Sequence, residues 1–116
     1  MSSTQPAETA RAAYQRRAKA RARRRRAQTQ ELRLARERLQ LAYVLRRELD
    51  ALATGAAELA RSAQGAGRAA DAARARLQAR RRRASEIVRQ TERFSLELGL
   101  AELDASDRNA LGLPDA

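Results

Sequence analysis

The chain has 116 residues, of which 24 are Arg and one is Lys, and it carries a formal net charge of +11. It contains neither Cys nor His. This length allows one domain at most. Without Cys and His, the chain cannot form a disulfide and lacks the common ligands of zinc and the common bases and nucleophiles of enzymes. The composition therefore predicts a protein that is not an enzyme, with no catalytic residue, metal, cofactor or small-molecule substrate.

The apolar residues are of a restricted kind, because 28 of them are Ala and 15 are Leu. The β-branched and aromatic residues that favour strands are scarce. Ala, Arg, Leu, Gln and Glu dominate instead, and they rank highest in helix propensity. We expect an all-α fold, which is a long helical hairpin or coiled coil with a basic N-terminal helical arm and a short acidic, Leu-rich C-terminal tail.

Residues 1–30, called the arm below, hold nine basic residues and one acidic residue. Pro6 and Glu8 suit the first turn of a helix. Tyr14 is the only large apolar side chain between residues 10 and 30, so the arm has no face to bury. The basic residues predict contacts with a polyanion, for which DNA and RNA are candidates, through Arg16, Arg17, Lys19, Arg21, Arg23, Arg24, Arg25 and Arg26. A solvated helix, with Arg enriched by a GC-rich genome, is the alternative.

Residues 31–98 contain the pattern expected of packed helices. Large apolar residues recur from Leu32, and a ladder with steps of three and four residues runs from Leu49 to Leu98. Such spacing is typical of coiled coils. We give the Ala rungs of this ladder little weight, because Ala is so frequent in the chain. The residues expected to hold helices together, called the seam, are Leu32, Leu39, Leu45, Leu49, Leu52, Leu77, Ile87, Phe94 and Leu98.

Two places could interrupt this helical region. Thr54-Gly55 suits a helix C-terminus, and residues 65–67 hold two Gly, each of which costs about 1 kcal/mol inside a helix. We favour a turn at 65–67, because it pairs Leu and Val with Ile87, Val88 and Phe94. An unbroken helix that dimerises along the seam remains an alternative.

A second run of cations, Arg80, Arg81, Arg82 and Arg83, lies within the helical region, where Arg80 interrupts the apolar ladder. It is a further candidate for polyanion binding. The alternative is a solvated helix face whose Arg stems cover neighbouring apolar surface.

The tail, residues 99–116, is acidic and rich in Leu. Ser106 is the expected N-cap of a short helix over 107–111, which Gly112 and Pro114 would end. The tail is either a docking motif for another protein or a segment that folds back on its own chain.

These features lead to one main functional hypothesis and one alternative. The first is a non-enzymatic helical adaptor or structural subunit that binds partner helices, or a second copy, through the seam and an anionic surface through the Arg clusters. The alternative is a nucleic-acid-binding accessory protein that uses the Arg clusters for sequence-independent phosphate contact. A membrane surface is disfavoured because the arm lacks an apolar face. We expect an intracellular, soluble protein, and the sequence does not distinguish cytoplasm from nucleus.

Overall fold

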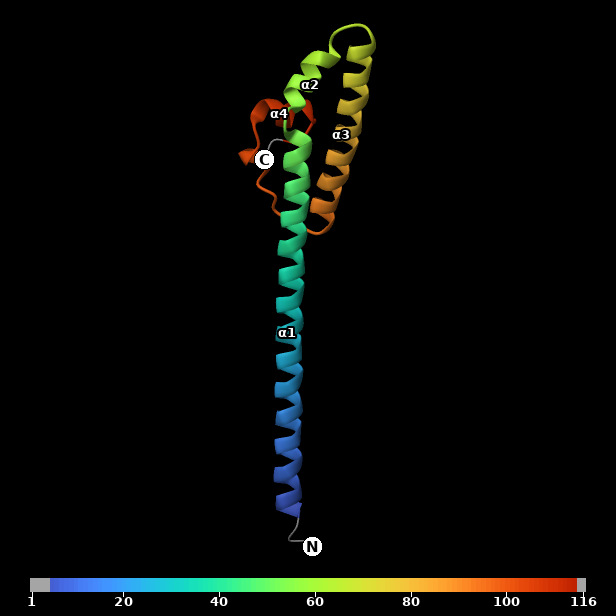
Figure 1. The fold of residues 1–116 in the computed structure, drawn as a ribbon. Helices are drawn as coiled ribbons and strands as arrows, with labels where there is room; N and C mark the ends of the chain where they lie inside the picture. The colour runs from blue at the N-terminus through green and yellow to red at the C-terminus, as the bar shows by residue number, and fades with distance from the viewer. Residues whose placement is uncertain (1–4, 115–116) are drawn as a thin grey trace. The chain divides into compact units, whose positions relative to one another are not determined.

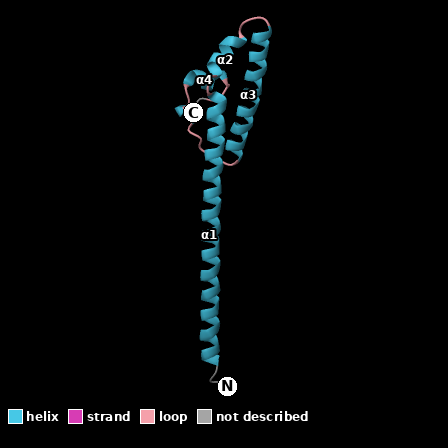
Figure 2. Ribbon diagram, in the orientation of Figure 1, coloured by secondary structure: helices cyan, strands magenta, loops and turns pink. Residues whose placement is uncertain are grey.

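The computed structural model describes residues 5–114, and all of its regular structure is helical (Figures 1 and 2). The elements are α1 (Gln5–Ala53), α2 (Ala56–Ala63), α3 (Arg68–Arg93), a 3-10 turn η1 (Leu100–Glu102) and α4 (Ala105–Ala110). The predicted all-α class with a helical hairpin is therefore confirmed. Two compact units divide the chain, one ending at Glu37 and the other beginning at Arg38. We call them the N-terminal and the C-terminal unit.

The C-terminal unit is an antiparallel hairpin of the end of α1 and α3 (Figure 1). Arg38, at the start of the unit, donates to the carbonyl oxygen of Phe94 at the end of α3. Further along α1, Glu48 pairs with Arg83. Residues later in α1 thus pair with residues earlier in α3, as in an antiparallel hairpin. The chain therefore reverses between α2 and α3, where the Gly-rich residues 65–67 lie.

Both Gly-containing sites interrupt the helices, but they do so in different ways. Gly55 has a φ of +75°, which ends α1 and lets α2 begin at the next residue. Gly67 has a φ of +97° and stands immediately before α3. A residue with a Cβ is strained at such φ values, and glycine is not. The alternative of one unbroken helix is therefore not what this chain forms, and the reversal takes place at 64–67 rather than at 54–55.

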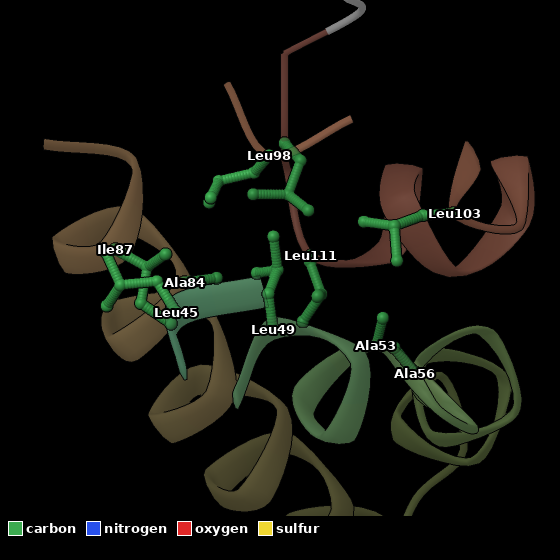
Figure 3. Close-up of a cluster of buried hydrophobic side chains, with 10 residues drawn as sticks. Leu45, Leu49, Ala53, Ala56, Ala84, Ile87, Leu98, Leu103 and Leu111 are labelled. Carbon is green, nitrogen blue, oxygen red and sulfur yellow. The ribbon is translucent and has the colours of Figure 1, made fainter. Parts of the chain in front are cut away.

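The core is small and draws on α1, α2, α3 and the chain after α3 (Figure 3). Leu49 on α1 and Ile87 on α3 are its largest fully buried side chains, each with no exposed surface. The chain after α3 adds four buried leucines, which are Leu98 in the loop and Leu103, Leu111 and Leu113 in the tail. The remaining members are Leu45, Ala53, Ala56 and Ala84.

Alanine contributes to the packed face of α3 more than the sequence pattern suggested. Ala70, Ala73 and Ala84 are buried on this helix at steps of three and four residues, as are Leu77 and Ile87. These small side chains lie on the expected ladder. They allow the helix to pack closely, so treating the Ala rungs as chance was wrong for α3.

The seam predicted from Leu32 is shorter within this chain. Leu45, Leu49, Leu77, Ile87 and Leu98 are buried, and Leu52 is half-buried. Three other predicted members are exposed to solvent, namely Leu32, Leu39 and Phe94. Within the C-terminal unit the buried face of α1 is confined to its last turns, where α3 and the tail cover it.

The tail folds back on the unit through its leucines. Asp104, not Ser106, caps α4, since its side chain accepts hydrogen bonds from the backbone N–H groups of Ser106 and Asp107 at 3.0 and 3.2 Å. The helix starts at Ala105, earlier than predicted. After α4, Gly112 takes a left-handed φ of +68° and the backbone N–H of Leu113 donates to Arg108 at 3.1 Å. This C-terminal motif turns Leu113 into the core.

Replacing a buried leucine should destabilise the fold more than replacing an exposed one. We expect Leu49→Ala to lower the free energy of unfolding by about 2–5 kcal/mol, because it leaves a cavity in a core with few large side chains. The matched control Leu39→Ala, at a side chain that is 72% exposed, should change it by less than about 0.5 kcal/mol. Urea unfolding followed by circular dichroism measures both. Equal losses in the two variants would contradict this core.

Candidate polyanion-binding site

The eight predicted cations of the arm are exposed, and none has an internal partner among the residues that the structure describes. Residues 10–30 belong to α1, whose Ala and Arg content favours helix without help from packing. Within residues 5–114, no hydrogen bond or ion pair engages the side chains of the eight predicted residues, which are Arg16, Arg17, Lys19, Arg21, Arg23, Arg24, Arg25 and Arg26, and all eight are exposed. Their charges are therefore available to a ligand.

These cations also repel one another. Arg17 and Arg21 are four residues apart, as are Lys19 and Arg23, and Arg21 and Arg25. Each like-charged pair at this spacing destabilises a helix by about 0.2–0.5 kcal/mol. A bound polyanion would replace repulsion by attraction, so it would stabilise the arm helix as well as bind to it.

The second run of cations differs from the arm, because three of its four Arg side chains form hydrogen bonds or ion pairs within the chain. Arg80 Nη1 donates to the carbonyl oxygen of Thr54 at 2.9 Å and lies 3.4 Å from that of Leu52. Arg81 Nε donates to the carbonyl oxygen of Ala110 at 2.7 Å. Arg83 binds Glu48 and Glu86. Only Arg82 of this run has no hydrogen bond or ion pair within the described residues. These contacts use part of the donor capacity of Arg80, Arg81 and Arg83 within the chain, and the polyanion role of this run stays a prediction.

Helix ends explain these contacts. The last carbonyl groups of a helix have no partner within the helix, and a nearby Arg satisfies them. Arg80 does so where α1 ends, and Arg81 where α4 ends. Arg74 donates to Ala63 at the end of α2 at 2.6 Å. Arg38 serves the end of α3, at Phe94 and Ser95, with distances of 3.1 and 2.9 Å.

The loop after α3 is held in the same way. Arg46 Nη1 donates to the carbonyl oxygens of Leu98 and Gly99 at 2.6 and 2.8 Å, and its Nε pairs with Asp50 at 2.8 Å. Sequence reasoning missed these Arg–carbonyl contacts, since every backbone offers the same acceptor. One signal was present, because Arg80 stands on a rung of the apolar ladder, where a solvated side chain is out of place.

An ion pair joins the two long helices. Arg83 Nε and Nη2 donate to the two carboxylate oxygens of Glu48 at 2.5 and 2.8 Å, a bidentate arrangement. The hydrogen bonds from Arg83, aided by its charge, lower the pKa of the Glu48 carboxyl against a partial desolvation that acts in the other direction. Both side chains remain partly exposed, so solvent weakens the pair.

Comparisons with protein-family models, with curated proteins and with solved structures find no match to this chain. Residues 5–114 contain no cluster of three or more His, Cys, Asp or Glu that could hold a metal ion. Among these residues, no helix is both long and apolar enough to cross a membrane.

The two kinds of Arg should differ in their effect on stability. We expect Arg80→Gln to lower the free energy of unfolding by about 1–2 kcal/mol, because the carbonyl oxygens of Leu52 and Thr54 lose a charged donor. Arg82→Gln removes the same charge two residues further along α3. It should lower the free energy of unfolding by less than about 0.5 kcal/mol. Urea unfolding of both variants measures the difference, and an Arg82 variant as unstable as the Arg80 variant would contradict the capping role.

The Glu48 pair should make stability depend on acid. Because the pKa of Glu48 is lower in the folded than in the unfolded chain, the pair stabilises the fold above the unfolded pKa, and this contribution is lost as the pH falls through the folded pKa. The difference in melting temperature between the wild type and Glu48→Gln should therefore be largest near neutral pH and shrink below about pH 4. A difference that stays constant from pH 7 to pH 3 would show that the charge of Glu48 does not matter.

Proposed function

We propose that this protein is a non-enzymatic, helical nucleic-acid-binding accessory protein whose arm contacts phosphates without reading sequence. Eight exposed cations lie within residues 16–26. Phosphate neutralisation by Lys and Arg, with release of counterions, supplies most of the affinity of sequence-independent binding. Arg adds a planar fork that matches phosphate oxygens.

One observation carries the proposal, namely the contrast between the two Arg runs. In the C-terminal unit, Arg80, Arg81 and Arg83 are engaged by carbonyl and carboxylate oxygens of the same chain. The arm offers its cations no such acceptor within the described residues. A bias in genome composition alone would enrich Arg everywhere, but it would not explain a segment that lacks both a core and internal partners for its charges.

The composition of the arm also selects among anionic ligands. A helix that lies on a membrane surface buries an apolar face between the lipid headgroups. The arm has Tyr14 as its only large apolar side chain between residues 10 and 30. Nucleic acid, whose phosphates can be bound by charge alone, suits this composition better.

A second candidate function is that of an adaptor for a partner helix. The tail already covers the seam around Leu49, which leaves less of it for a partner than the sequence suggested. However, Leu39, Tyr43 and Val44 remain exposed on α1, with Tyr43 under the guanidinium of Arg47. These side chains support a docking role for α1 in addition to the binding role of the arm.

Neutralising four cations in either unit tests the proposal. We expect the change of Arg23, Arg24, Arg25 and Arg26 to Gln to weaken binding to a mixed-sequence DNA duplex and to reduce the slope of log K against log salt by up to about 3–4. The fold of the C-terminal unit should be unaffected, because the arm makes no part of its core. Fluorescence anisotropy between 50 and 200 mM salt measures the slope.

The matched control changes four Arg of the C-terminal unit that are exposed and unpaired within residues 5–114. They are Arg68, Arg76, Arg82 and Arg89. Both variants lose the same formal charge, so a general effect of net charge would weaken both alike. Binding should depend on the arm set and change little with the control set. Equal weakening, or a wild type with no salt-dependent binding, would refute the proposed site.

A further inference from the structure

We infer that the arm binds double-stranded DNA as an α-helix lying in the major groove, with the strip around Ala18 and Ala22 toward the base edges and cations toward both phosphate walls. This inference rests on the proposed function and adds the form of nucleic acid and the way the arm meets it. The observation behind it is the distribution of charge around α1.

The cations form two rows that flank a strip of alanine. With about 100° between successive residues of a helix, Ala18 and Ala22 occupy the widest sector of residues 16–26 that lacks a cation, about 100° across. On one side of this strip lie Lys19, Arg23 and Arg26. On the other side lie Arg17, Arg21 and Arg25, while Arg16 and Arg24 point away from the strip.

This arrangement suits a ligand that surrounds the helix on two sides. A flat anionic surface would meet one row and leave the other in solvent. The major groove of B-form DNA carries a phosphate strand on each side and base edges on its floor. With the alanine strip on the floor, each row faces one strand. Methyl groups contact base edges without hydrogen-bond readout, in keeping with sequence-independent binding.

The dimensions agree with this placement. The major groove is about 12 Å wide and about 8.5 Å deep, and it admits an α-helix. A helix with its side chains is about 10–12 Å across, and the small Ala18 and Ala22 side chains allow a closer approach on the floor side. Residues 16–26 are about 16 Å long at 1.5 Å per residue, so a straight helix of this length can follow the groove.

Other nucleic acids fit less well. Single strands are held by bases stacked on aromatic side chains, and the arm has only Tyr14. Double-stranded RNA has a deep, narrow major groove that side chains cannot read. The minor groove of DNA is about 6 Å wide, too narrow for a helix.

The first experiment compares ligands for the intact protein. The probes are a DNA duplex, its single strand, an RNA duplex of the same sequence and a DNA duplex whose cytosines carry glucosyl groups that fill the major groove. At about 150 mM salt we expect the DNA duplex to bind at least about tenfold more tightly than each of the others, since only it offers an open groove between two phosphate walls.

The second experiment tests the two rows with variants of equal charge. One variant changes Lys19, Arg23 and Arg26 to Gln, and the other changes Arg17, Arg21 and Arg25 to Gln. Each should weaken duplex binding and reduce the salt slope by up to about 2.7, because each row faces one phosphate strand and B-DNA gives about 0.9 per contact. Circular dichroism of both variants shows whether the arm remains helical, and urea unfolding shows whether the C-terminal unit stays intact.

The outcomes separate this inference from the proposed function. Single-stranded DNA, duplex RNA or glucosylated DNA bound as tightly as the plain duplex would overturn groove binding and leave nucleic-acid binding in place. A loss of duplex binding in only one of the two row variants would likewise overturn groove binding, because it would show that the helix contacts DNA on one side. No salt-dependent binding to any of the four probes would overturn both proposals.

Discussion

The core of the C-terminal unit cannot be closed by two helices alone, and the rest of the fold follows from this constraint. The chain has one Phe, no Trp and only three residues of Val and Ile. Leu49 and Ile87 belong to one buried cluster of the hairpin, and the chain after α3 supplies the remaining cover through residues such as Leu98 and Leu111 (Figure 3). Small alanines on α3 let the helices approach closely, so that few large side chains suffice.

Folding the tail onto the hairpin brings several helix ends into one small unit, and their carbonyl groups need donors. Arginine supplies them from neighbouring elements, such as Arg81 for the end of α4 and Arg46 for the loop before η1. Asp107 performs the converse task, since its carboxylate accepts from the backbone N–H of Ala57 in the first turn of α2 at 2.9 Å. The tail is thus fixed by leucines within the core and by charged side chains at its edges.

The helical class and the place of the reversal could be predicted because propensity, glycine position and apolar spacing agree there. The buried part of the seam, such as Leu45 and Ile87, was predictable for the same reason. The packing of the tail was not, since its leucines lie on loops and short turns that have no fixed period. The exposure of Leu39 could not be predicted either. Apolar spacing identifies one face of a helix, but it does not show how far along the helix other elements cover that face.

For the candidate site, residue type identified the arm as a basic segment. It could not distinguish the cations of the arm, which are unpaired within residues 5–114, from Arg80–Arg83, which are mostly bound within the chain. Four consecutive Arg look alike in a sequence, and their difference lies in acceptors that belong to distant backbone, such as the carbonyl of Ala110 for Arg81. The N-cap of α4 shows the same limit on a small scale. Asp104 and Ser106 are both good caps, and the path of the chain selects Asp104.

The position of Leu113 in the core has a consequence for the order in which the protein forms during synthesis. The arm needs only local helical contacts, so it can form as soon as its residues are free of the ribosome. The core lacks one of its buried leucines until Leu113 has been added. Some 90 residues separate it from Arg26, and translation at about 5–20 residues per second takes roughly 5–20 s to cover them. During that interval the nascent chain presents a charged helix ahead of a hairpin whose apolar surface is still uncovered.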